Sequence, residues 1–248
     1  MSRLNGAAFT ESIVHARGPA YAYRTGMGMI GSAEFAVLMD DFVSPVTTNL
    51  PLGWDAVVID TGATVVTDTT AGSLGASGVL LFDSDGATEG ACFYGEKCLQ
   101  LTAGKKFFME MRFQTELAAD SDVQFGLSAL TAVVNPEDIW TTVATDVVAF
   151  GVLDGDATVT LLSDASNSGA TAELGTIDLS DATWHTLGIF FDGYDLFGYV
   201  DGAQAIRWSQ AAATIPKGVA LAPFVGFRNG SAATTEGHCD YVRYVLQR

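Results

Sequence analysis

Residues 181–202, DATWHTLGIFFDGYDLFGYVDG, decide the fold because they have the pattern of two β-strands whose turns are set by Asp-Gly pairs. Apolar side chains alternate with other residues over 187–191 and again over 196–200. Alternation with a period of two buries one face of each strand, and Asp-Gly supplies the positive φ that tight hairpin turns require. The pairs Asp192-Gly193 and Asp201-Gly202 therefore predict a hairpin followed by a second turn.

Strand patterns of this kind recur along most of the chain. We expect further strands at residues 54–59, 62–70, 79–82, 98–101, 106–113, 125–129, 147–153, 157–162, 171–177, 204–208, 221–228 and 239–246. Segment 125–129 is expected to lie beside 106–113, and residues 135–142 carry the best signal for a short helix or loop. This succession of short strands predicts an all-β protein, a two-sheet antiparallel sandwich.

Composition narrows the class of partner. The 248 residues can bury a large core in one main domain, and the formal net charge is −17. We expect no nucleic acid partner, because a phosphate backbone would be repelled. The chain lacks a run of 18 apolar residues and the pattern of a secretory signal. We therefore expect no membrane segment and synthesis in a cytoplasm.

Residues 1–39 differ from the rest of the chain. Glycines interrupt every periodicity there, and the segment carries a net charge of +1, against −18 for residues 40–248. This predicts an extended N-terminal arm ahead of a sandwich domain at 40–248. We expect the arm to lie along a partner; the alternative is an arm folded back on its own domain. The residues expected to bind the partner are Arg3, Arg17, Tyr21, Tyr23, Arg24, Met27 and Met29.

Five segments carry a resemblance to a known fold family. They are Lys106–Arg112, Phe125–Leu127, Trp184–Ile189, Tyr199–Gly202 and Phe224–Phe227. In this order they resemble the strand motifs of concanavalin A-like jelly rolls, the lectin, glucanase and laminin-G-like group. The resemblance covers about residues 40–248 and implies a two-sheet jelly roll preceded by the arm.

A narrower resemblance is to tailed-bacteriophage virion proteins in which such a jelly roll follows a short arm. The chain is similar to these proteins in size, in acidity and in the opening Asp40-Asp41-Phe42. The resemblance implies a capsid decoration or cement protein on the capsid exterior, without enzymatic activity. Its partner would be the major capsid protein, and it would act as a homo-oligomer, often a trimer.

Catalysis and metal binding find little support in the sequence. Glucanases of this fold use paired carboxylates in a Glu-x-Asp-x-x-Glu pattern, whereas this chain offers Glu110 and Glu116 with Arg112 where the Asp would stand. We expect Glu110 and Arg112 to form an ion pair, and we expect no catalytic residues and no cofactor. Calcium binding is left as an alternative, because residues 83–86 and 154–156 place several Asp side chains in predicted turns.

Cysteine, histidine and tryptophan residues leave further alternatives. Cys92, Cys98 and Cys239 lack metal-site spacing, which favours buried free thiols, and oxidation of Cys92 with Cys98 is the alternative. His185 is expected to be packed. Among the four tryptophans at positions 54, 140, 184 and 208, Trp184 and Trp208 are expected in the core and Trp140 exposed.

Two functions of other classes compete with capsid decoration. The first is a carbohydrate-binding or host-attachment module, which predicts an exposed aromatic side chain and a calcium-lined loop at one end of the sandwich. The second is a glucanase-like hydrolase, which predicts a groove lined by at least two carboxylates.

Overall fold

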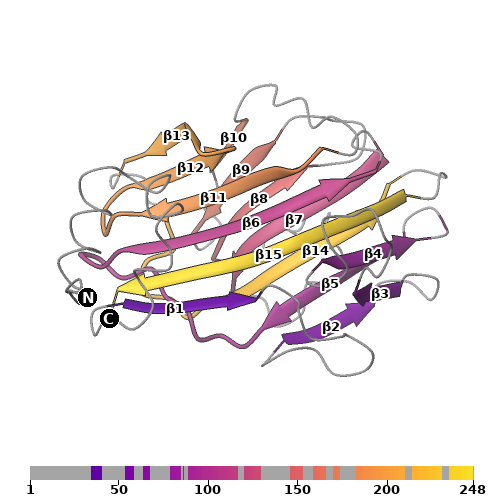
Figure 1. The fold of residues 1–248 in the computed structure, drawn as a ribbon. Helices are drawn as coiled ribbons and strands as arrows, with labels where there is room; N and C mark the ends of the chain where they lie inside the picture. Colours follow the sequence, from indigo (N-terminus) through magenta and orange to yellow (C-terminus); the bar gives the residue numbers. More distant parts are fainter. Residues whose placement is uncertain are drawn as a thin grey trace, which may run out of the picture.

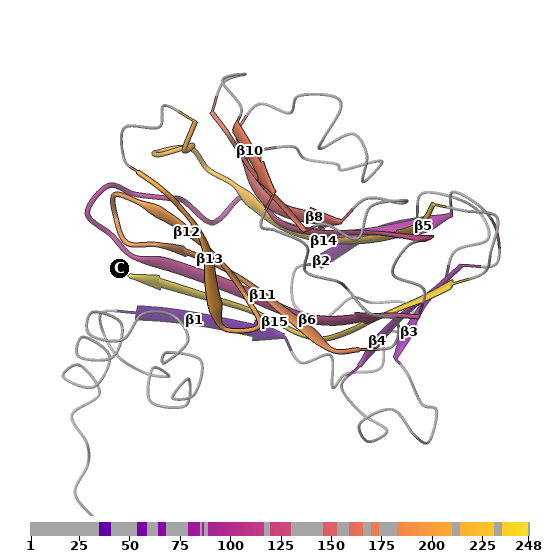
Figure 2. The same ribbon diagram turned by 90° about the horizontal axis from the view of Figure 1, so that it is seen from above.

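The computed structural model describes residues 35–40, 54–58, 64–67, 79–84, 86, 89–116, 120–129, 146–152, 159–165, 170–173, 183–209, 214–230 and 235–247. Fifteen strands in these ranges form two antiparallel sheets that pack face to face (Figures 1 and 2). This architecture confirms the predicted jelly-roll sandwich. In this part of the chain, no helix is long and apolar enough to cross a membrane.

Sheet A contains the predicted hairpin and the C-terminal strand. Its strands run in the order β13 (Ala203–Trp208), β12 (Leu196–Val200), β11 (His185–Phe191), β6 (Phe107–Thr115), β15 (Thr235–Gln247), β4 (Leu80–Ser84) and β3 (Thr64–Thr67). In addition, β1 (Phe35–Asp40) pairs with the C-terminal half of β15. Residues 35–39, the end of the segment predicted as an arm, therefore belong to sheet A.

Sheet B covers the other side of the core. Its order is β10 (Ala170–Glu173), β9 (Thr160–Asp164), β8 (Val147–Val152), β7 (Ser121–Ser128), β14 (Ala222–Asn229), β5 (Gly90–Gly95) and β2 (Trp54–Val58). Alternating side chains of both sheets fill the space between them. Leu99 and Leu101, which lie outside the strands, are buried in the same core. The largest fully buried side chains of this core are Phe125, Phe150, Phe191, Leu80, Leu99, Leu101, Met109, Met111, Leu127 and Leu161.

The predicted hairpin is confirmed. Phe191 pairs with Leu196, so the loop contains the four residues Asp192–Asp195 that separate the two alternating segments. The second turn has two residues, because Val200 pairs with Ala203. In that turn Asp201 has a φ of 48° and Gly202 a φ of 77°, as a tight hairpin turn requires.

Three other expectations about strands were wrong. Segment 125–129 does not lie beside 106–113, because β7 pairs with β8 and β14 in sheet B, whereas β6 pairs with β11 and β15 in sheet A. Segment 98–101 makes only two isolated bridges. Strand β5 was missed because Gly90 and Gly95 bound it and resemble turn signals. Alternation shows which face of a strand is buried, but it does not name the neighbouring strand.

A β-bulge in β15 sets the register at the centre of sheet A. Cys239 pairs with Phe113 and Tyr241 pairs with Arg112, so Asp240 is an extra residue on β15. The bulge places Asp240 and Tyr241 on the same outer face of the sheet, where they contact side chains of β6. After the bulge, Val242 faces the core, whereas strict alternation from Cys239 would place Tyr241 there.

We predict that deletion of Asp240 is far more damaging than its replacement by Asn. Deletion removes the bulge and moves one half of β15 out of register, which would turn core side chains to the outside. Asp240→Asn keeps the bulge and loses only a part-exposed ion pair, at a cost of up to about 1 kcal/mol. Urea unfolding measures both effects. A deletion variant as stable as Asp240→Asn would contradict this account of β15.

Candidate functional site

The outer face of sheet A carries a buried polar network centred on Glu110. This side chain lies on β6 and is only 5% exposed. Its Oε1 accepts a hydrogen bond from the Tyr241 hydroxyl at 2.9 Å and one from Arg243 Nη2 at 3.1 Å. The guanidinium of Arg243 also lies 5.5 Å from the ring centroid of Phe108. The carboxylate is therefore held by two partners from β15.

Burial dominates the acidity of this group. Desolvation raises the pKa of Glu110 from 4.5 to about 7, although the charge of Arg243 and the hydrogen bond from Tyr241 both lower it. A carboxyl group that titrates near neutral pH suits acid–base chemistry and also makes the stability of the fold depend on pH.

Arg112 shares this outer face but belongs to a second cluster. It pairs with Asp240, and its guanidinium lies 4.7 Å from the ring centroid of Trp184. Glu110 and Arg112 thus point the same way, as expected, yet the expected ion pair between them was wrong. Each takes its partner from β15, because the bulge brings Asp240 opposite Arg112. Trp184 is half-buried on this face and not in the core as expected.

We predict a pH effect on stability that depends on Glu110. Because its pKa in the folded protein lies above 4.5, its contribution is fully present below about pH 4.5 and is lost as the pH rises through about 7. The loss amounts to at most about 3 kcal/mol. Glu110→Gln removes this titration. Urea unfolding at about pH 5 and about pH 8 should show the larger fall for the unsubstituted protein, and equal falls would contradict the prediction.

His185 has a structural environment. It is buried at the start of β11, and its Nδ1 lies 3.0 Å from Asp201 Oδ2. Asp201 Oδ1 accepts a hydrogen bond from the Thr186 amide at 2.8 Å. The same carboxylate therefore joins the two-residue turn to β11, which agrees with the expectation of a packed histidine.

The outer face of sheet B also carries polar side chains. Asp122, Gln124 and Ser128 of β7 and Asp164 of β9 are all buried. Arg228 of β14 lies across from Asp122, with Nη1 3.8 Å from Oδ2. They lie on the same face as an apolar cluster of buried residues, so the outer face of sheet B is mixed. This cluster contains Cys92, Val147, Ala149, Leu162 and Phe224.

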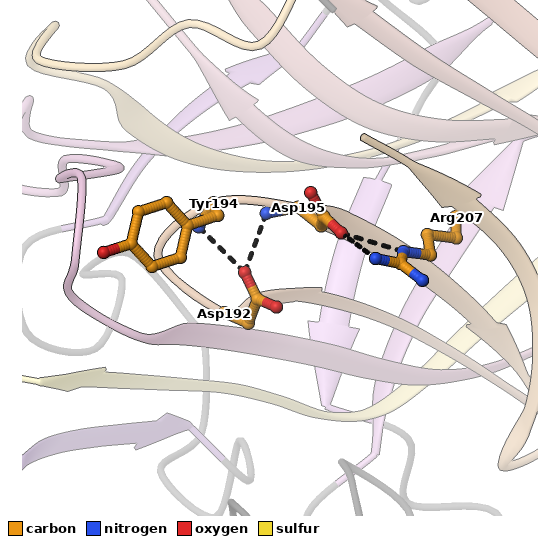
Figure 3. A network of polar contacts seen from close by, with 4 residues as sticks. All are labelled: Asp192, Tyr194, Asp195 and Arg207. Carbon is orange, nitrogen blue, oxygen red and sulfur yellow. Dashed lines mark hydrogen bonds and ion pairs between the residues drawn. The ribbon is translucent and has the colours of Figure 1, made fainter. Parts of the chain in front are cut away.

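The hairpin loop Asp192–Asp195 presents the one exposed large hydrophobic side chain in the part of the chain that the structure describes, Tyr194, at 52% exposure. Asp192 Oδ1 accepts hydrogen bonds from the amides of Tyr194 and Asp195 at 2.8 and 2.7 Å. Asp195 Oδ2 accepts from Arg207 Nε at 2.8 Å. Figure 3 shows the Tyr194 ring pointing away from the Asp195–Arg207 pair.

A second loop, residues 102–105, packs against this hairpin loop. The amide of Gly104 donates to the Gly193 carbonyl at 2.9 Å. Gly193 has a φ of 102°, and a Cβ atom there would lie 2.9 Å from the Gly104 backbone. The two loops pack so closely that only glycine fits at position 193. Residues 102–105 and Asp192–Asp195 together form one end of the sandwich, which we call the Tyr194 end.

Metal-ligating residues are not gathered in the described ranges. No group of three or more His, Cys, Asp or Glu side chains there could hold a metal ion. Asp83 is exposed, whereas Asp85 and 154–156 lie outside the described residues, so calcium binding stays a prediction. Cys92 and Cys239 are buried free thiols as expected, and Cys98 is exposed.

The residues predicted to bind a partner all lie outside the described part of the chain. They are Arg3, Arg17, Tyr21, Tyr23, Arg24, Met27 and Met29. Trp140, the predicted exposed aromatic residue, lies outside it as well. Sequence reasoning missed Tyr194, because it lies between the two alternating segments, where the pattern does not indicate exposure.

Comparison with known proteins shows the fold. No protein-family model and no curated protein sequence matches the chain. Among solved structures, the catalytic domain of an endo-1,3-beta-glucanase (laminarinase) from Thermotoga petrophila RKU-1 matches with a TM-score of 0.57 and 14% identity, over 87% of this chain and 99% of that one. The Emp47p carbohydrate recognition domain matches with a TM-score of 0.55 and 14% identity, over 86% and 97%.

Apo Crh5 transglycosylase is a third structural neighbour, with a TM-score of 0.54 and 14% identity over 86% of this chain and 84% of that one. These matches establish a concanavalin A-like jelly roll. None of the three is a phage capsid protein, so capsid decoration, the major capsid protein as partner, oligomerisation and a virion location stay predictions. The expectation that the protein is not an enzyme is contradicted, because chains of the same fold include glucanases and a transglycosylase.

Proposed function

We propose that the protein is a carbohydrate-recognising domain. The observation that carries the proposal is the fold, which aligns with almost the full length of a laminarinase catalytic domain and of a carbohydrate recognition domain. At this level of identity the likeness concerns the fold, and the function has to be supported by surface chemistry.

The Tyr194 end supplies surface chemistry that supports the proposal. A carbohydrate-binding module was expected to expose an aromatic side chain at one end of the sandwich. Tyr194 has this placement, although Trp140 was the residue expected from sequence. An aromatic ring offers an apolar face to the C–H groups of a sugar ring, and its polar tip stays hydrated.

Binding of the full-length protein to an array of neutral and acidic oligosaccharides tests the proposal. We expect binding to at least one sugar class, with dissociation constants of about 1 mM to 1 μM in calorimetry. A chain without residues 1–34 keeps β1 and should bind equally well. Absence of binding by the full-length protein would contradict the proposal, and loss on truncation would move the site out of the sandwich.

Glycoside cleavage is a second candidate function, and one observation favours it. The pKa of Glu110 is raised to about 7, a value that lets a carboxyl group act as an acid near neutral pH. The bulge places Asp240 on the same outer face, but Asp240 binds Arg112. The second carboxylate that glycosidases need is thus engaged in an ion pair.

Release of reducing ends from laminarin, a β-1,3-glucan, tests this second candidate. If the protein cleaves the glucan through Glu110, Glu110→Gln should lower the rate at least about 100-fold. Asp240→Asn tests Asp240 as the second carboxylate, and Gln114→Ala, at a part-exposed residue on the same face of β6, is the control for a structural change. A chain that releases no reducing ends, or a Glu110→Gln variant of unchanged activity, would exclude Glu110 as the acid.

A further inference from the structure

We propose that the Tyr194 end is a stacking site for the apolar face of a single uncharged hexopyranose, with Tyr194 as the platform and Asp192 as a hydrogen-bond acceptor. The inference rests on the proposed carbohydrate recognition and goes beyond it, because it assigns residues and a ligand class. It places the site at the tip of a hairpin of sheet A, away from the outer face of sheet B.

The loop that carries the platform is already ordered before a ligand arrives. Four hydrogen bonds hold its loop: two accepted by Asp192 Oδ1, one from the Asp192 amide to the Asp195 carbonyl, and one from the Gly104 amide to the Gly193 carbonyl. A side chain on a preordered loop loses little conformational entropy on binding, and a tyrosine has only two rotatable torsions.

Three other aromatic rings on the outer face of sheet A already have a partner. Phe190 and Phe197 contact each other with centroids 5.8 Å apart, and Arg207 lies 5.6 Å from the ring centroid of Phe197. Arg112 lies over Trp184. Tyr199 on this face and Tyr94 on sheet B are only part-exposed, whereas Tyr194 is 52% exposed and is the most open ring among the described side chains.

The hairpin loop and the segment that leads to Gly104 both carry polar side chains. Asp192 Oδ1 is used by the two loop amides, and Oδ2 remains able to accept a hydrogen bond from a sugar hydroxyl. In the supporting segment, Thr102 Oγ1 donates to Gln100 Oε1 at 3.2 Å, and both side chains are exposed. Hydroxyl, amide and carboxylate groups of this kind match the hydroxyls of a sugar.

The charges at this end also bear on the ligand. Lys105 lies in the segment 102–105, and Arg207 is paired with Asp195 through two guanidinium nitrogens. The molecule as a whole carries a formal charge of −17, and this field disfavours the approach of an anionic ligand. An uncharged hexose therefore fits the site better than a uronic or sialic acid.

Ligand-observed NMR with the full chain tests the inference, with the methyl glycosides of glucose, galactose, mannose and N-acetylglucosamine as neutral probes and glucuronic acid and N-acetylneuraminic acid as acidic ones. The variants are Tyr194→Ala, Tyr194→Phe and Tyr94→Ala. Tyr194→Phe keeps the ring. Tyr94 is a part-exposed aromatic residue on the outer face of sheet B and serves as the matched control for the other sheet.

We expect a neutral glycoside to bind, Tyr194→Ala to weaken it at least about tenfold, and the other two variants to stay within about threefold. Binding that survives Tyr194→Ala, or that is lost only in Tyr94→Ala, would overturn the inference and leave carbohydrate recognition intact. Preference for an acidic sugar would overturn the ligand class. Binding of no sugar here or on the oligosaccharide array would overturn both proposals. Circular dichroism of each variant checks that it is folded.

Discussion

The pairing of β15 with β6 is the constraint on which the rest of sheet A depends. Strand β15 lies between β6 on one side and β4 and β1 on the other, so its register positions all of them (Figure 1). The extra residue Asp240 changes that register at one point and turns Tyr241 and Arg243 outward, toward Glu110. Without it, the core positions of half the strand would face solvent.

This register explains why the outer face of sheet A is a self-contained polar network. Arg243 and Tyr241 donate hydrogen bonds to Glu110, and Asp240 forms an ion pair with Arg112. A buried charge is tolerated only when it is paired and hydrogen-bonded, so these partners stabilise a face that would otherwise be costly. Since these charged groups are engaged with one another, a ligand gains more at the Tyr194 end, where an aromatic ring is exposed on a loop that is already ordered.

Local pattern in the sequence predicted much of the fold. Alternation identified the strands β6, β11 and β12, and Asp201-Gly202 predicted the turn that follows the hairpin. The partner of β7 was not predictable in this way, since pairing depends on contacts between distant segments. The bulge left a signal that was overlooked, because the core positions Cys239 and Val242 are three residues apart instead of two. The exposure of Tyr194 was missed because it lies in the loop between two alternating segments, and alternation does not indicate how far a loop side chain is exposed.

The central functional claim is that a sugar binds at the Tyr194 end. The most direct measurement is a map of backbone amide chemical-shift changes in the isotope-labelled full-length protein as a neutral hexopyranoside is added. The account predicts that the changes concentrate in residues 102–105 and 192–195 and rise together to saturation. Changes concentrated on the outer face of sheet B, around Gln124 and Arg228, would contradict it.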